Sequence, residues 1–237
     1  MTAIQTVPGL AAQVYQAVLD EICDGVLSPG AHLVQEQLAE RFGVSRQPIQ
    51  QAMALLKADG LVEEAGKRGL RVTPLDVTLM RHHYEIRAAL DGLAARCAAQ
   101  RAKQNPAVAR EAETRGRRFL DAGAKAVGAG VPREQIRHDE AFHMLVYELS
   151  GNPLLPRTVE AHWRFLRRVM GEVLRHAEPP GAIWRQHAEI LDAITAGDAD
   201  LAEARAVAHI HVAADTLADA LTDHSGRAAP AVRDSSA

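Results

Sequence analysis

Residues 33–49, LVQEQLAERFGVSRQPI, carry the pattern that decides the fold of the N-terminal part of this chain. The apolar spacing predicts a short helix over 35–42, and Gly43 ends it because glycine readily adopts a left-handed backbone. Ser45 suits the N-cap of a second helix that continues to Ala58. Two helices separated by so tight a turn are typical of a helix-turn-helix.

The flanking segments complete a small domain. Before the quoted stretch, apolar residues at steps of four predict a helix over 10–25. After it, residues 61–62 and 70–73 have the pattern of two short strands around a glycine-containing turn, which predicts a hairpin. This is the order of a winged helix-turn-helix, which we expect over 10–74, with residues 1–9 as a disordered tail.

The second helix of the predicted pair has a face suited to reading DNA. Ile49, Met53 and Leu56 share one side of this helix and are expected in the core. The opposite side carries the polar and basic residues Arg46, Gln47, Gln50, Gln51 and Lys57. Arginine can donate two hydrogen bonds to guanine, and glutamine can form a similar pair with adenine.

Basic residues also gather in the predicted turn of the hairpin. Lys67 and Arg68 are expected to neutralise phosphates, and Gly69 to let the backbone approach DNA closely. Ser45 and the helix N-terminus behind it add a further phosphate site. The acids of residues 10–75 are expected on the other helices, which would confine a positive edge to the reading face. The alternative is an ordinary solvated surface on a purely structural helix-turn-helix.

The composition of the whole chain fits a folded cytoplasmic protein. Its 237 residues are 47% apolar and 24% charged, which allows one large or two small domains. The formal net charge of −3 means that DNA binding needs a local basic surface. Cys23 and Cys97 fit reduced thiols better than a disulfide framework. We recognise neither a signal peptide nor a membrane span, and therefore expect no membrane contact.

The remainder of the chain has helical spacing throughout. It predicts an all-α bundle of about six helices over 79–225, preceded by a linker at 75–78 and followed by a disordered tail at 226–237. A weak helix end is expected in the alanine- and glycine-rich stretch 123–130. The predicted helices are 77–102, 106–127, 132–150, 153–176, 180–196 and 199–223. The fold class is therefore mainly α.

Four residues of the bundle have spacings that suit metal ligands. Asp139 and His143 are four residues apart and project from one helix face. His187 lies on a later helix and His209 on the last one. One carboxylate and three imidazoles suit zinc, nickel, manganese or iron. Because the chain has eleven histidines, chance placement is the alternative, and no coordination is expected from His138, His162, His176, His211 and His224.

The quoted stretch and its flanks, residues 25–72, resemble the DNA-binding domain of GntR-family bacterial transcription regulators. The resemblance implies that Arg46 contacts DNA and that Arg41 contacts a phosphate. The family's next contact is usually an arginine followed by a glutamate, whereas Gln50 and Gln51 stand here. This departure implies a different operator, with a shift toward adenine at one position.

The C-terminal half resembles the FCD ligand-binding domain of the FadR subfamily. The matching motifs are Tyr84–Arg87, Leu90–Ala95, Asp139–His143, Gly151–Leu154 and His187–Leu191. The resemblance implies a divalent metal held by Asp139, His143, His187 and His209, with a small carboxylate bound over it. Its place in the motif makes Arg87 the first choice for pairing with the carboxylate. The second choices are Arg137 and either Arg164 or Arg168.

Together these features predict a homodimeric, ligand-responsive transcription regulator, with a repressor as first choice, although the sequence does not separate a repressor from an activator. A two-fold dimer carries two reading heads and therefore meets an inverted repeat in double-stranded DNA. An organic acid bound over the metal, with zinc as first choice, would favour one arrangement of the bundle. The alternatives are a metal-dependent hydrolase and a structural helical adaptor. We expect no enzyme, because the chain lacks the HExxH, GxSxG, P-loop and Rossmann glycine motifs, and Glu140 points away from the ligand face.

Overall fold

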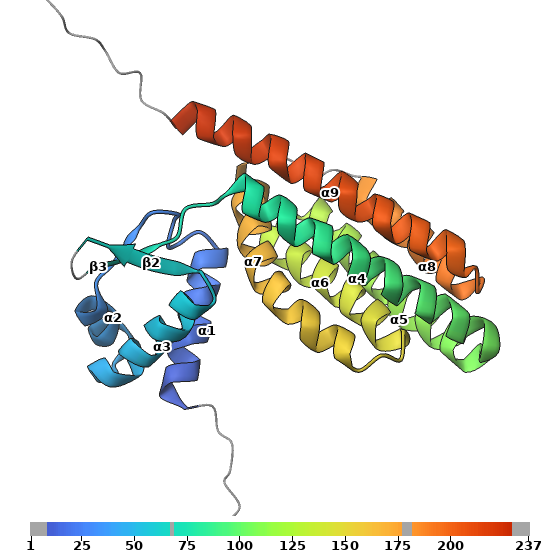
Figure 1. Cartoon of the computed structure of the whole chain (residues 1–237), viewed down its shortest axis with the longest axis horizontal. Coiled ribbons are helices and arrows are strands. Elements are labelled where there is room, and N and C mark those ends of the chain that lie inside the picture. The colour runs from blue at the N-terminus through green and yellow to red at the C-terminus, as the bar shows by residue number, and fades with distance from the viewer. Residues whose placement is uncertain (1–8, 67–68, 177–181, 229–237) are drawn as a thin grey trace, which may run out of the picture. The chain divides into compact units, whose positions relative to one another are not determined.

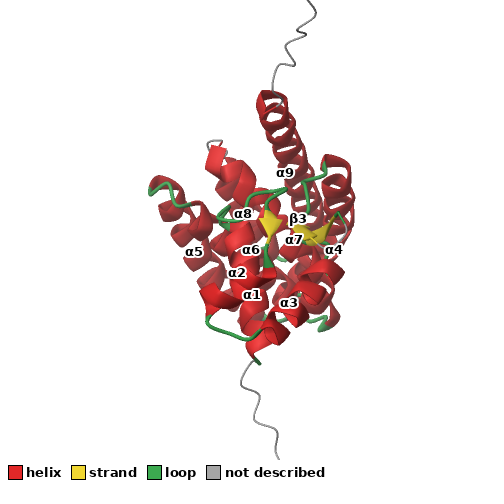
Figure 2. Ribbon diagram, turned by 90° about the vertical axis from the view of Figure 1, so that its left-hand side faces the viewer, coloured by secondary structure: helices red, strands yellow, loops and turns green. Residues whose placement is uncertain are grey.

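The computed structural model describes residues 9–66, 69–176 and 182–228. The chain divides into two compact units, residues 1–75 and 76–237. Helices dominate both units, and the strands of the described part all lie in the first (Figure 1 and Figure 2). The predicted fold class, mainly α, is confirmed. No helix among the described residues is both long and apolar enough to cross a membrane.

The helices of the first unit lie close to their predicted positions. They are α1 (Leu10–Cys23), α2 (Gln35–Phe42) and α3 (Arg46–Ala58). Gly43 follows α2 with a φ of +64°, the left-handed conformation that ends a helix and starts the tight turn. Ser45 occupies the N-cap position of α3, although its side chain makes no capping hydrogen bond.

The wing of the first unit is a hairpin of β2 (Val62–Ala65) and β3 (Gly69–Val72), whose strands pair antiparallel. The sequence does not predict the further strand β1 (His32–Leu33), which pairs with the other side of β3 and gives the order β1-β3-β2. Two residues are too few for an alternating pattern to show, so only the pairing with β3 reveals this strand.

One apolar core joins the helices and the sheet of the first unit. Ile49, Met53 and Leu56 are all buried in it, which confirms the side of α3 predicted to face inward. Val18 and Ile22 of α1 belong to the same core. Burial of such a side chain contributes about 1.5–3 kcal/mol, so this core holds α3 firmly and leaves its outer face free for recognition.

The second unit is a helical bundle in the predicted order. Its helices are α4 (Val77–Gln104), α5 (Pro106–Gly128), α6 (Pro132–Leu149), α7 (Leu154–His176), α8 (Ala182–Thr195) and α9 (Ala199–Ala228). Helix α4 begins inside the predicted linker, because the Asp76 side chain caps it by accepting hydrogen bonds from the backbone N–H groups of Thr78 and Leu79. Residues 226–228, predicted as tail, are helical.

Helices α4 and α9 run side by side (Figure 1). Arg81 pairs with Asp215 at 2.8 Å, whereas Gly92, further along α4, packs near the earlier Val207 of α9, so the two helices are antiparallel. A Cβ at Gly92 would lie only 2.8 Å from Cγ2 of Val207. The glycine therefore permits the close approach of the two helices.

The helix end predicted within the stretch 123–130 lies at Gly128, one residue beyond the predicted bound of 127. Helix α5 continues to Gly128, and Gly123 is buried within it. A Cβ at Gly123 would lie 1.9 Å from the indole ring of Trp184 on α8. The glycine makes room for Trp184, and this close packing supports the helix where the local composition does not.

Candidate metal centre and candidate DNA interface

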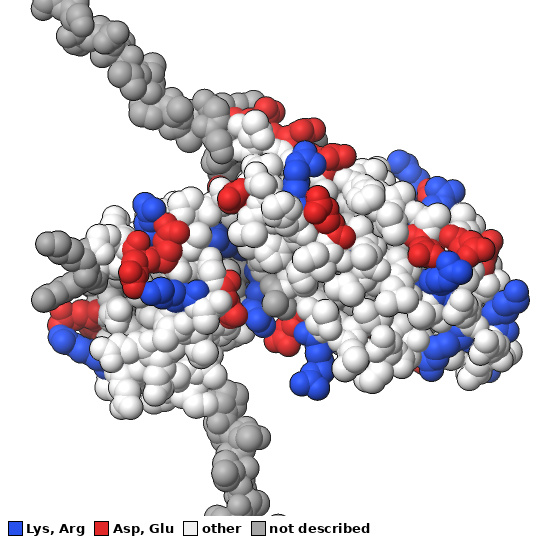
Figure 3. Space-filling model, viewed as in Figure 1, with Lys and Arg blue, Asp and Glu red and all other residues white. Residues whose placement is uncertain are grey.

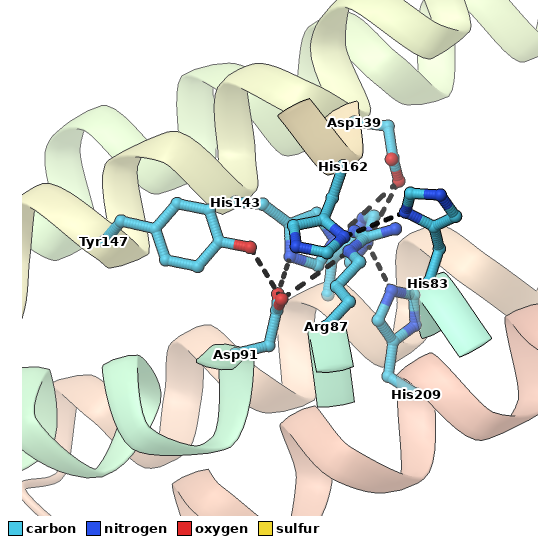
Figure 4. Close-up of polar contacts among 9 residues, drawn as sticks. His83, Arg87, Asp91, Asp139, His143, Tyr147, His162 and His209 are labelled. Carbon is cyan, nitrogen blue, oxygen red and sulfur yellow. Dashed lines mark hydrogen bonds and ion pairs between the residues drawn. The ribbon is translucent and has the colours of Figure 1, made fainter. Parts of the chain in front are cut away.

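The four predicted metal ligands lie together inside the second unit. Asp139 and His143 come from α6, His187 from α8 and His209 from α9, with one donor atom of each within 4.8 Å of the others. Nε2 of His187 is 3.0 Å from Nε2 of His209 and 3.3 Å from Oδ1 of Asp139. Nε2 of His143 is 4.0 Å from the same Oδ1. The side chains of Asp139, His143 and His209 point toward a common centre (Figure 4).

Two of the histidines are oriented by partners outside the cluster. Nδ1 of His143 donates a hydrogen bond to Oδ1 of Asp91 at 2.6 Å, and Nδ1 of His209 donates one to Oε1 of Gln186 at 2.9 Å. A proton on Nδ1 leaves the Nε2 lone pair free, the arrangement that metal-binding histidines usually have. Nε2 of His143 is buried and has no hydrogen-bond partner. The residues present therefore fit a metal ion.

Burial sets the electrostatics of the cluster. It lowers the pKa of His187 and of His209 well below the usual range of histidine, and neighbouring histidines add to the effect. Burial also raises the pKa of Asp139, an effect that His143 and Arg87 oppose. Neutral imidazoles keep the lone pair that a metal ion needs. The cluster thus disfavours protons on the imidazoles of His187 and His209 while it offers nitrogen and oxygen atoms as ligands.

A cavity of about 80 Å³ adjoins the cluster. One water needs about 10–15 Å³ on the same measure, so several waters or a small organic molecule can fit. Asp139 and His209 line the cavity together with Arg87. The guanidinium of Arg87 lies 4.2 Å from the ring centre of Trp163, and its Nε and Nη2 atoms have no hydrogen-bond partner although the side chain is buried.

The other predicted effector-binding arginines do not line this cavity. Arg137 is exposed and pairs with Glu134 one turn away on the same helix. Arg164 pairs with Glu160 at 3.0 Å, and the buried Arg168 is also absent from the cavity wall. Among these candidates, the structure brings only Arg87 to the cavity.

The aromatic residues divide between cavity and core. Trp184 lines the cavity. Trp163 is buried beneath Arg87, while Phe165 stacks on His83 with ring centres 4.2 Å apart. His162, which was expected to bind no metal, pairs its Nδ1 with Nδ1 of His83 at 2.9 Å.

The remaining histidines predicted not to coordinate also lie apart from the cluster, as far as their side chains are described. His211 is exposed on α9, and His138 lies 3.8 Å from Glu134. The side chains of His176 and His224 are outside the described residues.

Sequence reasoning missed the residues that support the ligands. Asp91 accepts a hydrogen bond from the hydroxyl of Tyr147 at 2.6 Å in addition to that from His143, and Gln186 holds His209. The one available signal for Asp91 was its spacing, because it follows Arg87 by one helical turn. Nothing along the chain indicates that it meets His143, which is 52 residues away.

The predicted recognition residues of α3 lie on the surface. Arg46, Gln47, Gln50 and Gln51 are all exposed, as is Ser45. Two arginines of this surface form ion pairs with acidic side chains, and each can contact DNA only if its ion pair breaks. Arg46 pairs with Glu36 of α2, and Arg41 pairs with Glu21 of α1 at 2.6 Å.

The expectation that the acids of the first unit lie on the other helices is wrong for Glu63 and Glu64, which lie on β2. Lys57 pairs at 2.6 Å with Glu64 on β2, and this hydrogen bond lowers the pKa of Glu64. Arg71 pairs with Glu63 on the same strand at 2.6 Å. On the face shown in Figure 3, acidic and basic side chains of the first unit lie next to one another. The acids lie on the wing as well as on the helices, because Glu63 and Glu64 form part of β2.

The structure describes only part of the turn that joins β2 to β3. Lys67 and Arg68 lie outside the described residues. Gly69 pairs with Ala65 across the hairpin, and a Cβ at Gly69 would lie 2.7 Å from the Ala65 carbonyl oxygen. The hairpin itself therefore requires this glycine, apart from any approach to DNA.

The fold and the two sites define a class of protein: a winged helix-turn-helix unit for DNA, followed by a helical unit with a buried polar centre and a cavity. Residues 10–72 match the family described as "Bacterial regulatory proteins, gntR family", and residues 82–212 match the "FCD domain". This chain belongs to the GntR family and carries an FCD domain. It is a transcriptional regulator with a DNA-binding domain, and the proteins of this family are regulators rather than enzymes.

Individual relatives agree with this assignment. The HTH-type transcriptional repressor RspR of Escherichia coli (strain K12) is 25% identical over 209 residues, which cover 86% of this chain and 87% of the relative. The "Probable D-xylose utilization operon transcriptional repressor" of Paenarthrobacter nicotinovorans is 30% identical over 208 residues, 86% of each chain. The solved structure "E. coli McbR/YncC" shares the fold, with a TM-score of 0.73, 21% identity and coverage of 90% of this chain and 99% of that one.

Proposed function

We propose that this chain is a homodimeric repressor of the FadR subfamily, acting in the cytoplasm on an inverted-repeat operator. A small carboxylate effector, bound over a divalent metal ion in the second unit, modulates its DNA binding. The observation that carries the proposal is the shared cavity: Arg87, whose Nη2 has no hydrogen-bond partner, lines it together with Asp139 and His209 of the ligand cluster. The names of two relatives, both repressors, support the direction of regulation.

Asp139, His143, His187 and His209 would hold the metal, with zinc as first choice and nickel, manganese or iron as alternatives. When bound, the metal supplies positive charge and open coordination positions for a carboxylate oxygen. The chain's own part is to present neutral imidazoles and to keep their orientation through Asp91 and Gln186.

Charge balance favours an anionic effector. The cavity is lined by the Arg87 guanidinium and the carboxylate of Asp139, and Asp91 pairs with Arg87 behind it, which gives these three groups a net charge of about −1 when all are ionised. A divalent ion makes the centre positive, and one carboxylate restores neutrality. Burial makes an uncompensated charge costly, so the loaded site has a strong preference for an anion. Arg87 can donate paired hydrogen bonds to that anion.

On the DNA side, we assign base contacts to Arg46, Gln47, Gln50 and Gln51 of α3. Arg41, Ser45, Lys67, Arg68 and Gly69 are assigned to the phosphate backbone. Arg46 must exchange Glu36 for a guanine edge, which an exposed ion pair permits because it contributes only about 0–1 kcal/mol.

A line of exposed apolar residues supports the homodimer. Leu79, Ile86 and Leu93 follow one another at seven-residue intervals on α4, and all three are more than 40% exposed. Residues seven apart lie on nearly the same helix face. Val212 on the neighbouring α9 is exposed as well. We assign this face to a second copy of the chain, since a two-fold axis matches an inverted repeat.

The test begins with selection of bound sequences from a random pool of DNA duplexes. The selected duplex is then titrated with zinc-loaded protein, with and without each of a panel of small mono- and dicarboxylates. We expect an inverted repeat and at least one acid that changes the dissociation constant by about 5-fold or more. Arg87→Met should abolish the effect of the acid, whereas the matched control Arg164→Met should retain it. Failure to select any sequence, or indifference to every acid, would contradict the proposal.

A further inference from the structure

Asp91 is a charged side chain buried at the junction of the two halves of the proposed site, only 3% exposed. Its oxygens have separate partners (Figure 4). Oδ1 accepts the hydrogen bond from Nδ1 of His143 at 2.6 Å. Oδ2 accepts one from the hydroxyl of Tyr147 at 2.6 Å and lies 3.5 Å from Nε of Arg87. One carboxylate therefore contacts a candidate metal ligand and the arginine proposed for the effector.

These partners require an ionised carboxylate. The Tyr147 hydroxyl donates to Oδ2, and the positive Arg87 guanidinium forms an ion pair with the same atom, which suits an ionised carboxylate with only acceptor atoms. The Arg87 charge offsets the cost of burying the Asp91 charge. With Oδ2 occupied, Oδ1 remains for His143, whose Nδ1 must then carry the proton.

We infer that Asp91 is a positioning residue, which keeps Nε2 of His143 unprotonated for the metal while it holds Arg87 at the cavity. The inference rests on the proposed function of this site. It extends that function because it assigns a role to a residue outside the ligand set. The substitution Asp91→Asn tests this role, since an amide has one acceptor oxygen and one donor NH2 group in place of two acceptor oxygens.

The expected effect of Asp91→Asn follows from the two donors that face Oδ2. Tyr147 and Arg87 both require an oxygen there, so the amide NH2 would turn toward His143. Nδ1 of His143 would then have to accept a hydrogen bond, and its proton would move to Nε2. The variant thus blocks the atom that faces the cluster without removing any metal ligand.

Two measurements on the full-length protein test this inference. The first is the nitrogen NMR spectrum of the histidine rings in the metal-free protein, with His143 assigned by its loss in His143→Ala. Wild-type His143 should carry its proton on Nδ1, and in Asp91→Asn the proton should move to Nε2. The opposite tautomer in the wild type would overturn the inference, and this result needs no folded variant.

The second measurement is zinc affinity, by competition with a chromophoric chelator. Asp91→Asn should bind zinc about 10–100-fold more weakly, as is usual when an outer partner of a metal-bound histidine is lost. The matched control Asp192→Asn, on the surface, should bind like the wild type. Equal affinity and an unchanged tautomer in Asp91→Asn would overturn the inference alone. A wild type without zinc binding would overturn the proposed metal centre, and the inference with it.

Discussion

The polar residues of the two units differ in what surrounds them. On the first unit, Arg46 and Glu36 form an ion pair whose side chains are 70% and 74% exposed. In the second, the His143–Asp91 pair has side chains only 3% and 4% exposed. Water screens the first pair, so its partners can separate at little cost. The second pair has lost its water, so its geometry is strongly determined. Exchangeable contacts suit a surface that binds DNA, and determined contacts suit a centre that selects an ion.

The largest effect is expected from removal of ligands in the buried centre. The double variant His187→Ala, His209→Ala removes two of the four proposed ligands and should purify without metal, whereas the wild type should carry about one zinc per chain. Elemental analysis after dialysis measures this directly. The double variant His138→Ala, His211→Ala removes the same number of imidazoles outside the cluster and should keep the metal. Absence of metal from the wild type would refute the centre.

The next largest effect is expected in the apolar core that packs beneath α3. Ile49 is fully buried beneath the reading face of α3. Ile49→Ala should lower the free energy of unfolding of the first unit by about 2–5 kcal/mol, because it leaves a cavity. Leu55→Ala, at a half-exposed position of the same helix, should cost far less. Chemical denaturation followed by circular dichroism compares the two, and equal losses would mean that this core does not hold α3.

A smaller effect is expected at the recognition surface itself. Arg46→Ala should weaken binding to the selected operator by about 1–3 kcal/mol and reduce discrimination at one base pair. Arg46→Lys keeps the charge but loses the paired hydrogen bonds, so it should retain non-specific binding while losing discrimination. Fluorescence anisotropy with matched and mismatched duplexes separates the loss of overall affinity from the loss of base-pair discrimination. Unchanged operator affinity in Arg46→Ala would exclude this docking of α3.

The smallest effect is expected when the exposed ion pair between Arg46 and Glu36 is removed. Glu36→Gln releases Arg46 and should change the stability of the first unit by no more than about 0.5 kcal/mol. It should also tighten binding to every duplex slightly, because a negative charge near the phosphates is removed. Thermal melts and salt-dependent titrations measure both quantities. A stability loss above about 1 kcal/mol would show that this exposed pair holds α2 against α3.

Much of the fold was predictable because its signals are local. Gly43 and Ser45 mark the turn of the helix-turn-helix, and the apolar spacing places α2 at its observed bounds. The support for the last turns of α5 was not predictable, since the packing of Trp184 against Gly123 joins two distant segments. The tertiary structure can override a weak local propensity.

The candidate site shows the same division. The spacing of Asp139 and His143 on one helix indicated a pair, and the structure brings His187 and His209 to it. Nothing in the sequence favoured Arg87 over Arg137 by physics alone, because Arg137 shares α6 with Asp139 and His143, whereas Arg87 stands on α4, which supplies no cluster residue. Only the packing shows that one lines the cavity and the other lies on the surface.

The sequence by itself determined the order of the helices and most of their ends to within a few residues, which face of α3 is apolar and which residue types are available as ligands. These properties follow from side-chain periodicity and turn chemistry within a few residues. Only the tertiary structure decided that Asp91 meets His143, that Glu36 meets Arg46 and that Arg87 reaches the cavity. These contacts depend on how segments distant in the sequence pack together and on which groups this packing removes from water. Neither the packing nor the loss of water can be predicted from the residues adjacent in the sequence.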